Sequence, residues 1–181
     1  MKKLLLLSCI LATSLYADPK PFLGASVSYT GGEAIATYQE TNVERTKGYG
    51  FKMGIENDIY RVYGDFGKVE WDNSTAKTNL LNGELTFPMG NPFGTKRDMK
   101  LYMGVHYGIV SFETDLTRND RDRGEMYGMQ FGILSPCLLN ERGTVEFGFR
   151  NSTTNITTQT ATYTHELSSL NSLYLGFNYS F

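Results

Sequence analysis

The chain has 181 residues, 13% of them aromatic, and its 17 basic and 19 acidic side chains give a formal net charge of −2. The length fits a single domain, and the acidic balance argues against a nucleic-acid partner, which would require a basic face. No apolar run beyond residue 17 is long enough for a transmembrane helix, so a helical membrane protein is excluded.

The first 17 residues have the layout of a secretory signal peptide. A short basic start precedes a mostly apolar run over 4–15, and Ala17 closes the segment. This pattern predicts removal of 1–17 and a mature domain over 18–181. The mature chain loses two basic residues and no acidic ones, so its net charge is 15 − 19 = −4. Its only cysteine is Cys137, which excludes an internal disulfide.

Eight segments of the mature chain alternate between apolar and polar residues at every second position. In residues 48–56, for example, Tyr49 and Phe51 share one face, whereas Lys52 and Glu56 share the other. The same alternation runs through 22–29, 48–56, 59–69, 79–87, 101–109, 127–133, 145–150 and 171–181. A period of two predicts β-strands. No segment has a convincing helical period, so we expect little or no helix.

The connecting segments alternate between long polar stretches and short turns. The polar stretches, read as loops, are 30–46, 70–78, 112–123 and 151–168. The turns are 57–58, 88–98 and 135–142. This rhythm predicts an up-and-down meander with loops at one end and turns at the other. The Thr-rich part of the last stretch, 151–164, has high β propensity, so we expect it to extend the last hairpin and offer an edge to partners.

Glycines share a face with the charged residues, and this bears on which way the apolar face points. A soluble barrel that binds an apolar ligand would point its apolar face inward, whereas a transmembrane barrel points it outward to lipid. Many glycines on a soluble surface would weaken the strands without compensation. Inside a narrow barrel they make room for larger neighbours. We therefore predict an all-β protein, an eight-stranded antiparallel up-and-down transmembrane β-barrel.

The last strand ends on aromatic residues at alternate positions. Phe177, Tyr179 and Phe181 resemble the C-terminal signature of bacterial outer-membrane β-barrels. With the signal peptide and the eight segments, the chain resembles the small outer-membrane barrels of the OmpA and OmpX type. The resemblance implies a monomeric protein of the Gram-negative outer membrane, with both termini in the periplasm. It also implies two partners, outer-membrane lipid with lipopolysaccharide, and the barrel-assembly machinery that reads the terminal strand.

Eight charged residues fall on the face that such a barrel turns inward. They are Lys52, Glu56, Arg61, Asp65, Glu84, Lys100, Glu146 and Arg150. Four charges of each sign in a narrow lumen must pair, because unpaired buried charges are costly. An eight-stranded barrel has room only for side chains. We therefore expect a paired network rather than an open pore, with a narrow or gated ion path, as in a porin-like protein, as the alternative.

Two loop regions carry residue types that suggest further roles. His165, Glu166 and Ser168 are residue types of hydrolase chemistry, and some eight-stranded outer-membrane barrels modify lipid A. This enzyme reading stays an alternative, since no motif surrounds the three residues. The arginines of 112–123, Arg118, Arg121 and Arg123, are candidates for contact with lipopolysaccharide phosphates. We expect no catalysis, no cofactor and no metal, and we expect His106 to be a hydrogen-bonded lumen residue.

Overall fold

The structure is a computed structural model that describes residues 18–36, 39–71, 74–92, 94, 97–114, 122–138, 140–159 and 164–181. The predicted signal peptide, 1–17, lies outside the described residues. Within the described ranges, no helix is long and apolar enough to cross a membrane.

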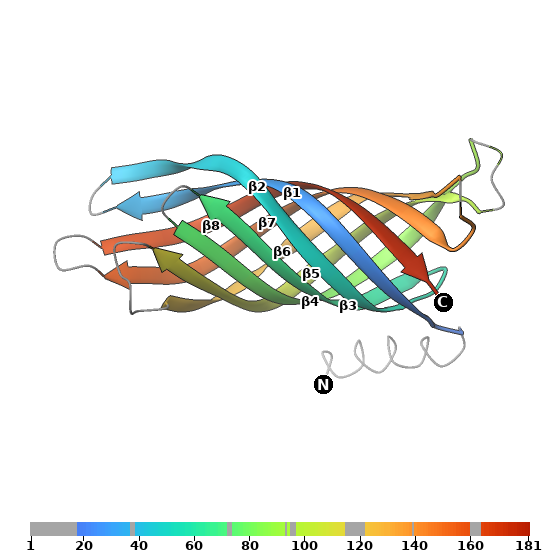
Figure 1. Ribbon diagram of the computed structural model, residues 1–181, viewed down its shortest axis with the longest axis horizontal. Coiled ribbons are helices and arrows are strands. Elements are labelled where there is room, and N and C mark those ends of the chain that lie inside the picture. Colours follow the sequence, from blue (N-terminus) through green and yellow to red (C-terminus); the bar gives the residue numbers. More distant parts are fainter. Residues whose placement is uncertain are drawn as a thin grey trace, which may run out of the picture.

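Eight strands follow one another in chain order and close into a barrel (Figure 1). They are β1 (Lys20–Ala36), β2 (Gln39–Glu56), β3 (Tyr60–Trp71), β4 (Ser74–Gly90), β5 (Met99–Thr114), β6 (Asp122–Pro136), β7 (Gly143–Gln159) and β8 (Thr164–Ser180). Each strand is antiparallel to its neighbours, and β8 closes the barrel on β1, where Ser180 lies opposite Phe22. The predicted all-β, eight-stranded antiparallel up-and-down architecture is confirmed.

Three of the four polar stretches that we read as loops, 30–46, 70–78 and 151–168, are mostly strand, whereas most of 112–123 lies outside the described residues. β1 and β2 stay paired up to Ala36 and Gln39, and β3 ends only three residues before β4 begins at Ser74. The predicted loops 30–46 and 70–78 were therefore wrong as loops. A hydrogen-bonded hairpin needs no apolar side chains, so it continues past the point where the hydrophobic alternation stops. The expected extension of the last hairpin is confirmed, since β7 runs to Gln159.

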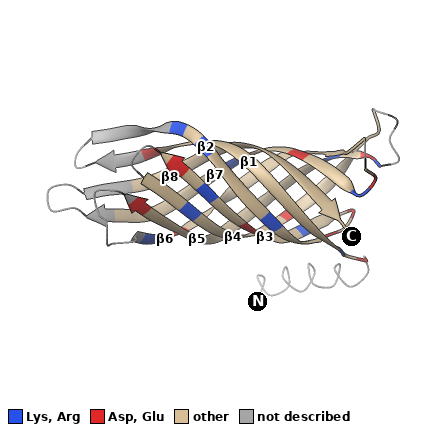
Figure 2. Ribbon diagram, in the orientation of Figure 1, with Lys and Arg blue, Asp and Glu red and all other residues tan. Residues whose placement is uncertain are grey.

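The barrel is apolar outside and polar inside. On the outer face Leu81 and Val105 are each 64% exposed, whereas inside the barrel Lys52 is 1% and Glu146 0% exposed. Figure 2 shows charged residues as isolated positions along strands that are otherwise uncharged over most of their length. Water would penalise such an outer face, but lipid solvates it. The soluble alternative, with its apolar face inward, is therefore wrong, and the predicted direction of the two faces is confirmed.

The two ends of the barrel differ. The turn end, as we call it, holds the three short connections and both ends of the barrel domain (Figure 1). There the amide of Phe181 donates a hydrogen bond to the carbonyl of Pro21, with 3.0 Å between nitrogen and oxygen. The opposite end, the hairpin end, holds the last described residues of β1, β3, β5 and β7 and the first described residues of β2, β4, β6 and β8 (Figure 1). An even number of strands places both termini at one end.

The lumen contains an apolar cluster toward the hairpin end. It comprises Ala76, Leu80, Val110, Met126, Ile156, Leu167 and Leu170, with Trp71 and Phe112 packed against it. This part of the interior was not expected from sequence, because the alternation had suggested a polar inner face throughout. Past the membrane belt, each inward position is shielded by the facing hairpins, so apolar residues can fill it.

Candidate functional site: the filled lumen and its mouth

Arg61 on β3 lies at the centre of the charged network in the lumen. The strand register places it directly between Glu56 on β2 and Glu84 on β4. Its guanidinium nitrogens approach Glu84 Oε2 at 3.0 Å and Glu56 Oε2 at 3.4 Å. A third contact, of Nη2 with Glu146 Oε2 at 3.3 Å, crosses the lumen to β7. One guanidinium therefore ties β3 to three other strands, which its planar set of donors allows.

Glu146 on β7 is the second centre of the network and is fully buried. Its Oε1 accepts a hydrogen bond from Lys52 Nζ at 2.9 Å, and its Oε2 accepts one from Asn178 Nδ2 at 2.8 Å. Lys52 lies opposite Asp65 in the strand ladder, yet it forms its ion pair with Glu146 across the lumen. The narrow barrel thus brings into contact residues that lie 94 positions apart in the chain.

Arg150 pairs with Asp65, whose Oδ2 lies 2.5 Å from Arg150 Nη2. Arg150 Nε also donates to Gln130 Oε1 at 2.9 Å. Gln130 Nε2 in turn donates to Glu84 Oε1 at 2.6 Å, which links this pair to the contacts of Arg61. The result is one connected network. Sequence reasoning did not single out Gln130, although its inward position between Gly128 and Gly132 was a usable signal.

Four aromatic side chains enclose the cations of the network. Lys52 Nζ lies 4.5 Å from the ring centre of Tyr174, and the Arg61 guanidinium lies 5.0 Å from that of Phe22. The hydroxyls of Tyr102 and Tyr174 are 2.6 Å apart. Tyr63 OH donates to Glu84 at 2.5 Å. These contacts stabilise desolvated cations through the faces of the rings. The role of the tyrosines was missed, although each occupies an inward position of its strand.

Glycines give the tyrosines their space. A Cβ atom on Gly148 would lie 1.9 Å from the hydroxyl oxygen of Tyr102, and one on Gly132 would lie 2.5 Å from the same oxygen. Real side chains do not approach so closely. The prediction that inward glycines make room for larger neighbours is confirmed at these positions.

Lys100 does not join the central network. It lies at the turn end, where its Nζ contacts Asp58 Oδ1 at 2.8 Å. The hydrogen bond from this ammonium lowers the pKa of Asp58. We had placed Lys100 in the network from its inward parity alone. The alternation along the strand places Lys100 on the correct face. It does not give the position along the barrel axis, and Lys100 is next to the end of its strand.

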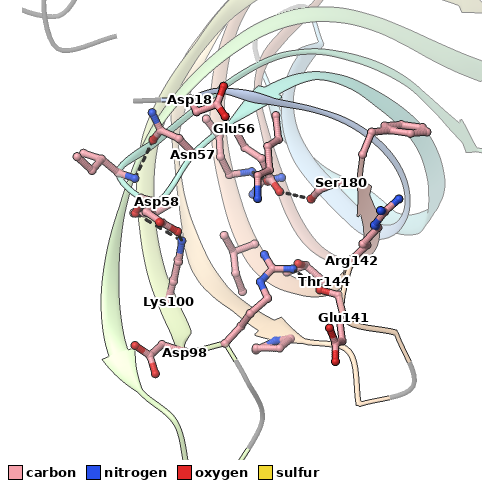
Figure 3. A pocket seen from close by; sticks show the side chains of 18 residues that line it. Asp18, Glu56, Asn57, Asp58, Asp98, Lys100, Glu141, Arg142, Thr144 and Ser180 are labelled. Carbon is pink, nitrogen blue, oxygen red and sulfur yellow. Dashed lines mark hydrogen bonds and ion pairs between the residues drawn. The ribbon is translucent and has the colours of Figure 1, made fainter. Parts of the chain in front are cut away.

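Two cavities lie on opposite sides of the network and share no lining residue. The larger, at the turn end, has a volume of about 680 Å³ and is lined by residues such as Arg61 and Thr144 (Figure 3). The smaller, of about 50 Å³, lies toward the hairpin end and is lined by Lys52, Asp65 and Arg150, among others. The side chains of the network lie between them. Such an arrangement can hold charges rigidly.

The other candidate residues lie apart from the network or outside the described part of the chain. His106 Nε2 is 2.9 Å from Ser152 Oγ inside the barrel, so it is a hydrogen-bonded lumen residue as expected. Ser168 Oγ donates to the carbonyl of Glu33 at 3.0 Å. The side chains of His165 and Glu166, and all of Arg118 and Arg121, lie outside what the structure describes. Arg123 is described and is exposed at the start of β6.

Within the described ranges, no group of three or more His, Cys, Asp or Glu side chains is placed to hold a metal ion.

The aromatic residues of the last strand lie at the turn end of the outer surface. Phe177 is 44% and Phe181 57% exposed. The rings of Tyr179 and Phe181 meet edge to face, with 5.3 Å between their centres. These side chains are therefore accessible on the outside of the barrel.

Solved structures with the same architecture are outer-membrane barrels. Neisserial surface protein A matches with a TM-score of 0.63 and 12% identity, over 89% of this chain and 97% of that one. Outer membrane protein H of P. aeruginosa matches with a TM-score of 0.61 and 22% identity, over 90% and 99%. The outer membrane protein AlkL matches with 0.53 and 14%, over 92% of each chain. At these identities the likeness concerns the fold, which is that of the eight-stranded outer-membrane barrels. No protein-family model matches the sequence, and the search of curated proteins also gave no match.

Proposed function

We propose that this chain is an integral outer-membrane protein with a structural or surface-interaction role. Paired charges fill its lumen, and it does not conduct solutes. The observation that carries the proposal is the lumen itself. The network around Arg61 and Glu146 separates the two cavities, and the apolar cluster lies beyond it toward the hairpin end. Two barriers of different chemistry in series oppose both ions and polar solutes. The proposal assigns no catalytic residue.

The proposed partners are membrane lipid and lipopolysaccharide. Lys68 and Lys77 lie directly opposite each other on β3 and β4, near the hairpin end, and Lys68 faces Tyr49 of the outer surface. Each lysine pairs with a glutamate, Glu70 or Glu113. Cations and tyrosines at the edge of an apolar belt suit lipid headgroups. We propose that Arg118, Arg121 and Arg123 add phosphate contacts beyond this belt.

Two further proposals, on the oligomeric state and on the assembly partner, follow from the closed sheet and the last strand. Because closure of the sheet leaves no edge strand within the belt, we propose a monomer. We propose that Phe177, Tyr179 and Phe181 serve as the signal for the barrel-assembly machinery, supported by their accessible rings.

In planar bilayers, the purified protein is expected to show no large, steady conductance. The network lies between the two cavities, and breaking it to open a path would leave buried charges without their partners. A heat-dependent shift in gel mobility on the same sample verifies that the barrel is folded. A stable conductance of porin size from such a folded sample would contradict the proposal.

We propose that the turn end, with both termini, faces the periplasm and that the hairpin end faces outward. An exported chain delivers its N-terminus to the periplasm, and an even number of strands returns the C-terminus to the same side. A protease of broad specificity added to intact cells is therefore expected to cut at the hairpin end, in the connection between β1 and β2 or in that between β7 and β8. Cleavage confined to 88–98, at the turn end, would show the opposite orientation.

A further inference from the structure

Four of the eight strands continue past the others at the hairpin end and form what we call the extension sheet. There β2 pairs with β1 up to Gln39, β1 pairs with β8 up to His165, and β8 pairs with β7 up to Gln159. In Figure 1 these blue, cyan and red-orange strands reach farther to the left than the green and olive strands. The extension sheet has the order β2–β1–β8–β7, so it has two edges, although the barrel that carries it is closed.

The longer of these edges, which we call the β2 edge, is Gln39–Arg45. β2 begins nine residues before Gly48, whereas β3 ends two residues after Val69, the partner of Gly48. Where β3 ends, Thr46 Oγ1 donates to the carbonyl of Glu70 at 2.6 Å. Beyond this contact, no described strand pairs with β2 on the side opposite β1. The backbone amides and carbonyls on that side can therefore accept another strand.

The edge on β7 is shorter. The last pair between β6 and β7 joins Met126 to Thr154, so β7 extends beyond it only over Asn155–Gln159. The start of this segment is also in contact with β6, because the amide of Glu125 donates to Asn155 Oδ1 at 2.7 Å. The β2 edge is therefore the better site for a partner.

Register shifts mark the level at which the extension sheet leaves the barrel. The pairing shifts by one residue between β1 and β2 at 30–32, between β1 and β8 at 33–34, and between β7 and β8 at 153–156. β-Bulges of this kind commonly stand where pairing with a neighbour ends, and they are designed features of a sheet. The separation of β2 from β3 is therefore part of the fold.

The charges of the β2 edge do not select a partner of one sign. Glu40 and Glu44 are followed by Arg45 and Lys47, so this stretch carries two charges of each sign. The feature that the edge offers is its row of backbone donors and acceptors, about 23 Å long for seven residues in a strand. An extended polypeptide supplies the matching row, as in recognition by strand addition.

We propose that the β2 edge binds an extended segment of a partner polypeptide, which joins the extension sheet as a strand antiparallel to β2. The added strand takes the position that β3 would occupy if it were longer, and antiparallel pairing continues the pattern of the sheet. This inference rests on the proposed surface-interaction role and names its class of partner. The location of the partner outside the cell follows from the proposed orientation.

The test uses a capped heptapeptide of alternating threonine and valine, residues of high β propensity, added at millimolar concentration to the folded protein in detergent micelles. Hydrogen exchange followed by NMR is expected to slow about tenfold at every second amide of Gln39–Arg45, since alternate amides face the new strand. The amide of Val105, within the closed wall, is the internal control and should not change.

Two modified peptides separate backbone pairing from side-chain contact. Methylation of every second peptide nitrogen leaves one edge of the peptide intact, so binding should persist. Methylation of all the nitrogens should abolish it. On the protein, proline is introduced as Thr41→Pro or Asn42→Pro, at whichever position exchanges faster in the free protein. This change should weaken binding about tenfold, because it removes a donor from the free edge while β1 stays paired.

Equal binding of the fully methylated peptide would overturn the proposal, as would slowed exchange without the period of two. Absence of binding to a sample whose gel mobility shows a folded barrel would overturn it too. So would dimers that form through the β2 edge without peptide, because the edge would then bind a second copy. None of these results bears on the closed lumen, which is tested separately by conductance.

Discussion

Replacing Arg150 with methionine is expected to destabilise the folded barrel by about 3 to 5 kcal/mol, because it leaves the buried carboxylate of Asp65 without its cation. Asp65 is 3% exposed, and Arg150 is its ion-pair partner at 2.5 Å. Unfolding by urea in lipid vesicles, followed through the fluorescence of the single tryptophan, Trp71, measures the change. Trp71 packs against the apolar cluster, so its emission reports on the packed lumen.

The double change Arg150→Met with Asp65→Leu is expected to recover most of this loss. Replacing both members of a buried pair with apolar groups is often neutral, and the remaining deficit of about 1 kcal/mol reflects the lost hydrogen bond to Gln130. Lys100→Met is the matched control at the mouth, where the partner Asp58 is fully exposed. A double variant no more stable than Arg150→Met alone would show that the charges do not act as a pair.

Val105→Arg is the second change with a large expected effect. Val105 lies in the middle of β5 on the outer face, between Gly83 and Met129 of the neighbouring strands, and is 64% exposed. In water, replacing an exposed valine with arginine would change the free energy of unfolding very little. In a bilayer, an arginine on the lipid face near the midplane costs about 2 to 4 kcal/mol. The same urea titration in lipid vesicles measures this loss.

Ser111→Arg serves as its control. Ser111 has the same parity on the same strand but lies six residues closer to the hairpin end, or about 20 Å along the strand. It is opposite Lys77 and Arg123, so cations already occupy this level. Its cost should be at most about 1 kcal/mol, as for positions near the interface. Equal effects of the two arginines would mean that the outer face of Val105 does not contact lipid.

Much of the lumen could be predicted because side-chain direction along a strand is a local property. Successive residues point to opposite faces, so the alternation around Lys52 and Glu56 was enough to place them inside. The same parity explains how Tyr63 and Gln130 could have been found, had inward polar groups other than charges been considered. The glycines on the charged face and the aromatic residues on the opposite face then indicated which face points to lipid.

Depth along the barrel was less predictable. Lys100 has the inward parity of a network member but lies at the mouth, and Leu80 has the parity of Asn82 but belongs to the apolar cluster. Hydrophobic alternation marks only the part of each strand that faces lipid. Beyond the membrane the strands stay paired through backbone hydrogen bonds, without alternating apolar side chains. The lengths of the four hairpins were underestimated for this reason.

The sequence alone determined that eight strands form, which residues each turns inward, and that the inward charges are of both signs, because these follow from local periodicity and composition. The identity of each partner was decided only by the tertiary structure. Asp65, Glu84 and Glu146 were all candidate partners of Arg150, which pairs with Asp65. Lys52 lies opposite Asp65 in the strand ladder but pairs with Glu146. Contacts across a lumen depend on the tilt and stagger with which the closed sheet joins distant strands, and no local pattern encodes that geometry.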